Sequence, residues 1–474
     1  MNSRILNTTC EAKWIISTVF LVIMLLGSSQ NARCQTGLKT FTGTFPDHAT
    51  YLIEVPHDWN GTLFLYSHGT GFPGTPNPPT DNGDVLVRLY LLTNGYALAG
   101  SSYASLGWAV EDALRDQVAV LDTFDRLVGH PSRTIAWGHS MGGLITAGLV
   151  QKNPDRFSGA VCLCGLLAGS VGVWNEFLDA AFAFNTLLGS GRLEVVHIRD
   201  PISNRLNAQA VLNDAATTPQ GQARIVLAAA LADTSGWDDP LSPQPTDFNT
   251  LAINQFGSFS GFNFDVFFAL RADVEKRAGG NPSWNTGVDY ERQLKLSVDY
   301  AEVQALYKQA GLSLADDLKK LNDANRIAAD PSAVSYLSNN VIFNGDLNVP
   351  VLTVHTSGDD IANVQMEQAY ASVVHRANRD SFLRETFVHR AGHCQFTSAE
   401  TIAALEALVH RLDTGEWQGI DAKALNSAAS ALPMAYDDIF GAGSQPLLSP
   451  AFFDYVPATF LRPFDSLDRT ESSE

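Results

Sequence analysis

The stretch Trp137-Gly138-His139-Ser140-Met141-Gly142-Gly143 decides how the rest of the chain is interpreted. Residues 132–137 include β-branched and aromatic side chains, as in a short strand, and residues 144–150 are mostly apolar, as in a buried helix. A G-x-S-x-G pentapeptide between a strand and a helix is typical of a sharp turn that exposes its serine as a nucleophile. The two glycines leave room for the strained backbone that such a turn requires. The sequence therefore predicts that Ser140 is a nucleophile at the end of a strand.

Strand-like and helix-like segments alternate on both sides of this turn. Strands are expected at residues 41–45, 49–56, 61–67, 96–101, 159–165, 349–355 and 385–389, and helices at 85–93, 110–128, 364–374 and 398–412. Residues 57–61 are expected to form the turn of a hairpin between the second and third of these strands. Strands that alternate with helices indicate βαβ units, so the predicted fold class is α/β, with a mostly parallel sheet flanked by helices.

The alternation is interrupted once, and the interruption suggests how the chain is organised. Between residues 167 and 340 helix-like stretches follow one another without a convincing strand, which predicts an inserted, mainly helical cap. A chain of 474 residues is long enough for one large domain with such an insertion. The predicted parts are a signal peptide (1–34), the first part of the α/β core (35–166), the cap (167–340), the second part of the core (341–418) and an irregular C-terminal extension (419–474).

The N-terminal residues have the pattern of a secretory signal peptide. Arg4 and Lys13 precede the apolar run 14–26, and the polar residues 28–33 follow it. The run is short for a membrane span, so we expect cleavage near Gln35. The protein is then expected to be secreted or periplasmic, without stable membrane association after cleavage. An uncleaved N-terminal anchor is the alternative.

Charge and cysteine content limit the partners and cofactors that we expect. The formal net charge of −19, with no basic run in the sequence, argues against nucleic acid and anionic membranes as partners. No residue spacing is typical of a metal site, and no glycine-rich phosphate motif follows the first strands, so no cofactor is expected. A cut after Cys34 leaves three cysteines, and one disulfide between Cys394 and either Cys162 or Cys164 is compatible with the sequence.

A nucleophilic serine needs a neighbouring base, and the base needs a carboxylate that orients it. His393 is the candidate base, because it follows a predicted strand in a glycine-containing turn. Asp359, directly after another predicted strand, is the candidate carboxylate, and Asp360 is the competing one. His355 and His389 lie inside predicted strands, where a structural role is expected.

Three motifs in this order resemble an α/β-hydrolase fold serine hydrolase with a helical cap, and the resemblance covers residues 49–412. They are Gly138-His139-Ser140-Met141-Gly142, His355-Thr356-Ser357-Gly358-Asp359 and Gly392-His393. The resemblance implies a Ser-Asp-His triad in that chain order and favours Asp359 over Asp360. It also implies an oxyanion hole formed by the backbone N–H of Met141 and by a donor in loop 68–71, for which Thr70 is the first candidate.

The dipeptide His393-Cys394 is similar to the tannase and feruloyl-esterase family at this loop only. In that family a cysteine beside the serine forms a disulfide with the cysteine beside the histidine. Here His139 stands at the position before Ser140, so half of that pattern is missing.

These features predict an exported serine hydrolase that cleaves small-molecule or polymeric carboxylic esters through an acyl-enzyme. Phe256, Phe259 and Phe262 in the cap are expected to line an apolar substrate pocket, and the alternative is that such rings form the core of the cap. A capped peptidase such as an aminopeptidase is an alternative enzyme, for which Asp238-Asp239 or Asp316-Asp317 could hold a substrate amine. A non-catalytic binding protein on the same fold is a third possibility.

Overall fold

A computed structural model describes residues 37–439, 443 and 446–465 of the chain. Contacts divide the chain into two units, Met1–Gly37 and Leu38–Glu474, and the second is described here. The predicted signal peptide lies outside the described residues. None of the helices in the described ranges combines the length and the apolar composition that a membrane crossing requires.

The described residues form one nine-stranded sheet in the order β1-β2-β4-β3-β5-β6-β7-β8-β9. Its strands are β1 (Lys39–Thr44), β2 (Thr50–Val55), β3 (Thr62–Ser67), β4 (Ala97–Ser101), β5 (Arg133–His139), β6 (Gly159–Leu163), β7 (Val351–Gly358), β8 (Leu383–Ala391) and β9 (Phe452–Phe453). Neighbouring strands from β4 to β8 are parallel, and only β1–β2, β2–β4 and β8–β9 are antiparallel pairs. The predicted α/β fold class with a mostly parallel sheet is confirmed.

The hairpin predicted between β2 and β3 is wrong. Strand β4 lies between them, pairs antiparallel with β2 and parallel with β3, and the hairpin of this region joins β1 to β2. Strand β3 is buried along its whole length. A central place in the sheet gives such a strand a neighbour on each edge and a covered surface on each face.

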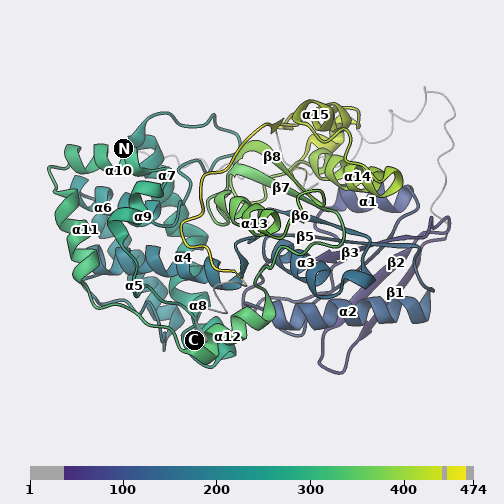
Figure 1. Ribbon diagram of the computed structural model, residues 1–474, viewed down its shortest axis with the longest axis horizontal. Coiled ribbons are helices and arrows are strands. Elements are labelled where there is room, and N and C mark those ends of the chain that lie inside the picture. The colour runs from purple at the N-terminus through teal and green to yellow at the C-terminus, as the bar shows by residue number, and fades with distance from the viewer. Residues whose placement is uncertain (1–36, 440–442, 444–445, 466–474) are drawn as a thin grey trace, which may run out of the picture. The chain divides into compact units, whose positions relative to one another are not determined.

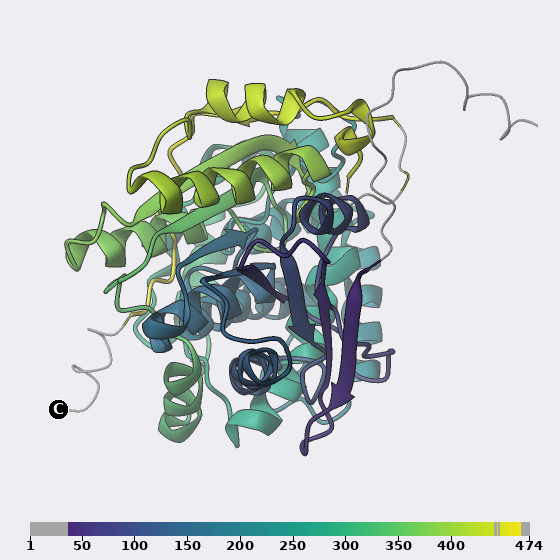
Figure 2. The same cartoon turned by 90° about the vertical axis from the view of Figure 1, so that its right-hand side faces the viewer.

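Helices cover both faces of the sheet, as Figure 2 shows. One face packs against α1 (Val85–Thr93) and α14 (Ser398–Thr414). The other face packs against α2 (Val110–Leu127), α3 (Met141–Lys152) and α13 (Gln365–Arg376). The carboxyl ends of the parallel strands are therefore the place where loops meet between two helical layers, as ligand sites in such sheets require.

Residues 167–340 lie between β6 and β7 and contain helices but no strand. Figure 1 shows these helices grouped together in teal and green. They are α4 (Gly169–Phe184), α5 (Pro201–Ala215), α6 (Pro219–Ala230), α7 (Phe248–Ser258), α8 (Arg271–Ala278), α9 (Tyr290–Leu296), α10 (Tyr300–Gln309), α11 (Leu314–Asp323) and α12 (Pro331–Asn340), with π-helical turns at Asn185–Gly189, Phe259–Asn263 and Val266–Leu270. Helix α4 is buried along its whole length. It is the central element around which this helical segment packs.

The chain after residue 419 is more ordered than predicted. It contains α15 (Ala422–Ser430), and β9 adds a short antiparallel strand to β8. Helix α15 begins where the Asp421 side chain accepts a hydrogen bond from the Ala424 N–H, and alanine favours its continuation. The expectation of an irregular extension is wrong for these elements, because residues 421–430 combine an Asp421 cap with alanines that favour a helix.

Candidate active site

Ser140 occupies the sharp turn between β5 and α3. Its backbone φ of 59° and ψ of −127° lie in a region that a residue with a side chain rarely adopts. A Cβ atom at Gly138 would lie 2.4 Å from the Ser67 carbonyl oxygen, and one at Gly142 would lie 1.9 Å from the same atom. The backbone of β3 therefore passes so close to the turn that both positions require glycine.

The structure brings Ser140, His393 and Asp359 together in one hydrogen-bonded chain. The Nε2 atom of His393 lies 2.8 Å from the Oγ atom of Ser140. Its Nδ1 atom lies 2.8 and 3.0 Å from the two carboxylate oxygens of Asp359. Asp359 comes from the end of β7 and His393 from the loop after β8, so the parallel sheet positions both side chains beside the turn of β5.

Asp359 is held as a carboxylate by the groups around it. Its Oδ1 atom accepts hydrogen bonds from the backbone N–H groups of Ile361 and Ala362. Burial alone would raise the pKa of Asp359, but the charges and hydrogen bonds of His393 and His355 outweigh burial and hold that pKa well below its usual range. A carboxylate in this state accepts the Nδ1–H of His393 and fixes the ring orientation.

Asp360, the competing carboxylate, has a different environment. Burial and the neighbouring charge of Asp359 raise the pKa of Asp360 to about 6. Its backbone oxygen accepts a hydrogen bond from the side-chain amide of Asn263, which links the loop after β7 to the helical segment. Of Asp359 and Asp360, Asp359 is the residue whose carboxylate hydrogen-bonds to the ring of His393.

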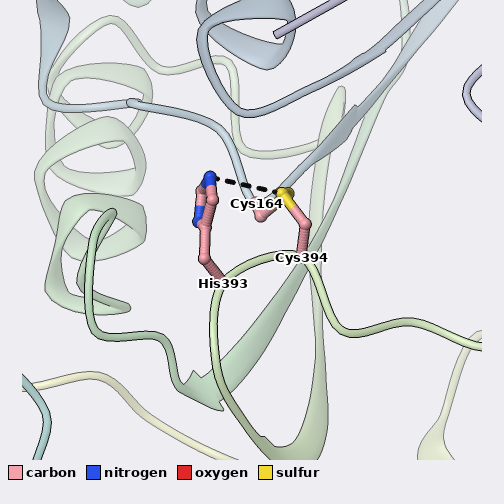
Figure 3. Close-up of side chains that lie close together, drawn as sticks. All are labelled: Cys164, His393 and Cys394. Carbon is pink, nitrogen blue, oxygen red and sulfur yellow. Dashed lines mark hydrogen bonds between the residues drawn. A yellow bond between two sulfur atoms is a disulfide. The ribbon is translucent and has the colours of Figure 1, made fainter. Parts of the chain in front are cut away.

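A disulfide bond joins Cys164 to Cys394, beside His393 (Figure 3). The sequence left Cys162 and Cys164 as alternatives, and the structure selects Cys164, while Cys162 is a buried free thiol. Cys164 directly follows β6, whose Leu163 carbonyl accepts a hydrogen bond from the N–H of Ser140. The bridge thus ties the histidine loop to the strand next to the serine, although His139 stands at the position before Ser140.

Cys164, His393 and Cys394 form the only group within the described ranges whose ligand atoms are spaced closely enough for a metal ion. A sulfur atom in a disulfide is no thiolate, and thiolates are the cysteine ligands that metal ions use. The group therefore does not fit a metal site.

The residues predicted to form the oxyanion hole lie beside Ser140. Met141 begins α3 and is buried, and the hydroxyl of Thr70 lies 3.6 Å from its sulfur. A Cβ atom at Gly69 would lie 3.3 Å from the Cβ atom of Ser140, so loop 68–71 passes directly over the serine. This loop is supported by the His68 ring, which stacks on Tyr103 and donates its Nδ1–H to the Gly69 carbonyl at 2.8 Å.

His139 is buried beneath the turn rather than directed at a ligand. Its Nδ1 atom lies 3.3 Å from the hydroxyl of Tyr66. Burial, assisted by the nearby His393, lowers the pKa of His139 to about 3, so the ring is uncharged at neutral pH. His139 is therefore a buried, neutral ring that contacts Tyr66 next to the nucleophile.

The three phenylalanines predicted to line a pocket lie in three different places. Phe259 is fully buried among the rings of Phe184, Phe264 and Phe267, so it belongs to the core of the helical segment and not to a pocket wall. Phe256 lines a groove between α6, α7 and α10, none of whose lining residues belongs to the Ser140 site. Phe262 packs edge-to-face on Phe72, just after loop 68–71, with 5.3 Å between ring centroids.

The two acidic pairs considered for an amine site also differ. Asp317 forms an ion pair with Arg224 at 2.7 Å and accepts a hydrogen bond from Tyr307, so its charge is already neutralised inside the helical segment. Asp238 lies beside the histidine loop, because its carbonyl oxygen would be 3.3 Å from a Cβ atom at Gly392. Only the pair that contains Asp238 is near the candidate site.

Sequence reasoning missed Glu367. This residue is fully buried in the first turn of α13, and its Oε1 atom lies 2.8 Å from the Nδ1 atom of His355. His355 is buried in β7, as expected of a structural histidine, whereas the His389 side chain is exposed on β8. The available signal was that Glu367 shares one face of the predicted helix with Val364, Tyr370 and Ala371, because a carboxylate on an apolar face requires a partner.

Comparison with known proteins shows the family. The chain is 32% identical over 426 residues to o-phthalyl amidase from Xanthobacter agilis, and the match covers 82% of this chain and 90% of that protein. The chain belongs to the family of o-phthalyl amidase. Residues 105–236 also match the family model described as serine aminopeptidase, S33. Together with the sheet and its flanking helices, these matches identify an α/β-hydrolase.

Two solved structures are similar over most of the chain. Feruloyl esterase B from Aspergillus oryzae has a TM-score of 0.44 and 15% identity, and the match covers 79% of this chain and 80% of that chain. An esterase from Aspergillus oryzae has a TM-score of 0.42 and 15% identity, with 80% of this chain and 79% of that chain covered.

Proposed function

We propose that this protein is a serine hydrolase that cleaves carboxylic esters and amides through an acyl-enzyme on Ser140. The observation that carries the proposal is the 2.8 Å approach of the His393 Nε2 atom to the Ser140 hydroxyl, with Asp359 on the far side of the ring. This arrangement supplies a nucleophile, a base and an orienting carboxylate within hydrogen-bond reach of one another.

The reaction proceeds in two halves. His393 takes the proton of Ser140 while the serine oxygen attacks the substrate carbonyl, and the N–H groups of Met141 and Thr70 stabilise the resulting oxyanion. His393 then protonates the leaving alcohol or amine as the carbonyl–heteroatom bond breaks. A water molecule, deprotonated by His393, attacks the acyl-enzyme and releases the acid with Ser140 restored.

The substrate class that we propose is an ester or amide of an aromatic carboxylic acid. The relative o-phthalyl amidase supports amide cleavage and an aromatic acyl group by its name. The Phe72–Phe262 ring pair beside loop 68–71 offers an apolar surface on which an aromatic acyl group can pack. The same triad serves esters and amides, because both reactions pass through a tetrahedral oxyanion and need a protonated leaving group.

Purified protein should be assayed against matched phthalyl and benzoyl esters and amides, with an aminoacyl anilide beside them. Turnover of the aromatic acyl substrates is the expected result. Preference for the anilide with a free amino group would instead favour an aminopeptidase, for which the family-model match and the position of Asp238 are the supporting observations. Failure to react with a fluorophosphonate would contradict the serine mechanism and favour a binding protein.

We propose further that the protein is exported after removal of its N-terminal signal peptide. The Cys164–Cys394 disulfide supports this proposal, because such bonds persist in oxidising compartments outside the cytosol. The N-terminus of protein recovered outside the cytosol should lie near Gln35. A retained Met1 on membrane-bound protein would contradict the proposal.

Phe262→Ala should change the ranking of aromatic and aliphatic acyl substrates by roughly 10- to 200-fold in relative kcat/KM, the scale of a small change in apolar pocket contact. Phe259→Ala is the matched variant. It should leave the ranking unchanged and lower the free energy of unfolding by about 3–5 kcal/mol, because this ring is core. The substrate panel and thermal denaturation of both variants provide the check. An unchanged ranking in folded Phe262→Ala would remove this residue from the acyl pocket.

A further inference from the structure

A second histidine lies behind the carboxylate that contacts His393. The His355 ring is completely buried in β7, and its Nε2 atom lies 2.7 Å from the Ala362 carbonyl oxygen and 3.4 Å from the Oδ2 atom of Asp359. Its Nδ1 atom lies 2.8 Å from the Oε1 atom of Glu367. Both ring nitrogens therefore face oxygen atoms at close range.

The chemistry of these oxygens determines where the protons are. A carbonyl oxygen only accepts hydrogen bonds, so the Nε2 atom of His355 must carry a hydrogen. When the Glu367 carboxyl is ionised, its Oε1 atom also only accepts, and the Nδ1 atom then carries a hydrogen as well. The second oxygen of Glu367 is buried and has no hydrogen-bond partner among the described residues. His355 is therefore the group that offsets the cost of burying the Glu367 carboxylate. The ring is then an imidazolium between Asp359 and Glu367.

The other titratable groups around the His355 ring add no charge to it at neutral pH. Burial raises the pKa of the Cys162 thiol on β6 and of the Tyr370 hydroxyl on α13 far above the usual values. Burial and the charge of Glu367 raise the pKa of Glu385 on β8 to about 8. These groups are therefore uncharged at neutral pH, and the carboxyl groups nearest to the ring nitrogens are those of Asp359 and Glu367. Burial lowers the pKa of His355, but the hydrogen bonds and charges of these two carboxylates outweigh burial and raise it to about 10.

We propose that His355 is a positioning residue, a permanent imidazolium anchored by Glu367, which holds Asp359 ionised and offsets its negative charge toward His393. The inference rests on the proposed serine mechanism. A cation on the far side of Asp359 makes a second positive charge on His393 less favourable and makes protonation of Asp359 less favourable. Both effects keep His393 available as a base at lower pH, so the Glu367–His355 pair extends activity toward acid.

Glu367→Gln removes the negative charge that anchors the His355 imidazolium, and it changes the shape of the side chain little. Its amide can donate to the Nδ1 atom of a neutral His355 ring, which keeps its Nε2–H on the Ala362 carbonyl. The acid limb of the kcat/KM profile should then move to higher pH by about one unit, because losing the positive charge of His355 makes a positive charge on His393 more favourable. His355→Gln should move the limb in the same direction. Tyr370→Phe, equally buried on α13 but without a change of charge, should leave the limb in place.

Nitrogen NMR of histidine-labelled wild-type protein at pH 7 reads the ring itself and does not depend on activity, so it separates this proposal from the proposed function. We expect both ring nitrogens of His355, assigned with the His355→Gln variant, to be protonated. An unprotonated nitrogen would overturn the imidazolium. A protonated ring with an unmoved acid limb in folded Glu367→Gln would overturn the positioning role. Activity that survives loss of Ser140 would contradict the serine mechanism and leave the NMR result standing.

Discussion

Replacing Ser140 with alanine should lower kcat/KM for an aromatic ester at least about 10³-fold, because the hydroxyl is the proposed site of acyl transfer. The change removes one oxygen atom at a turn whose backbone is set by Gly138 and Gly142, so the fold should persist. Steady-state hydrolysis and labelling by a fluorophosphonate measure the effect, and thermal denaturation checks the fold.

Ser132→Ala is the control for this variant. Ser132 lies just before the opposite end of β5, is exposed, and donates a hydrogen bond to the Gly61 carbonyl far from the histidine loop. We expect it to retain wild-type hydrolysis. If Ser140→Ala keeps more than a few per cent of wild-type activity, Ser140 is not the nucleophile.

Asp359→Asn should reduce kcat by about 10⁴-fold, the scale expected when the orienting carboxylate of a triad becomes an amide. The introduced amide would keep its one oxygen for the N–H groups of Ile361 and Ala362, so its NH₂ group would face the Nδ1 atom of His393. That arrangement favours the tautomer with its hydrogen on Nε2, which cannot accept the proton of Ser140. Pre-steady-state or steady-state kinetics at pH 7–8 give the comparison.

Asp360→Asn is the adjacent matched variant and should have a much smaller effect. Asp360 accepts a hydrogen bond from the helical segment through its backbone oxygen, whereas the carboxylate oxygens hydrogen-bonded to the Nδ1 atom of His393 are those of Asp359. A larger loss in Asp360→Asn than in Asp359→Asn would assign the acid to Asp360. Mild losses in both variants would remove the acid from the end of β7.

The features that the sequence predicted correctly are those set by short-range rules. The glycines at positions 138 and 142 indicate a tight turn at Ser140 because the backbone requires them there, and the structure shows why, since the Ser67 carbonyl leaves no room for a Cβ atom. The alternation of strands and helices likewise predicted a parallel sheet, because its period is visible along the chain.

The features that the sequence could not predict depend on residues distant in the chain. Nothing in residues 57–61 shows that β4 is inserted between β2 and β3. The choice of Cys164 over Cys162 follows from the face and end of β6 that meet the loop after β8. The burial of Phe259 follows from its packing against the rings of Phe184 and Phe264. Each outcome is fixed by packing between elements, which local pattern does not contain.

The disulfide also determines the covalent topology of the molecule. It joins residues 230 positions apart, and every helix from α4 to α12 lies in the chain between them. The helical segment is thus part of a closed covalent ring that begins beside β6 and ends beside His393. A protease that cuts this ring once opens the chain but releases no fragment, so the two pieces remain one molecule until a reductant separates them.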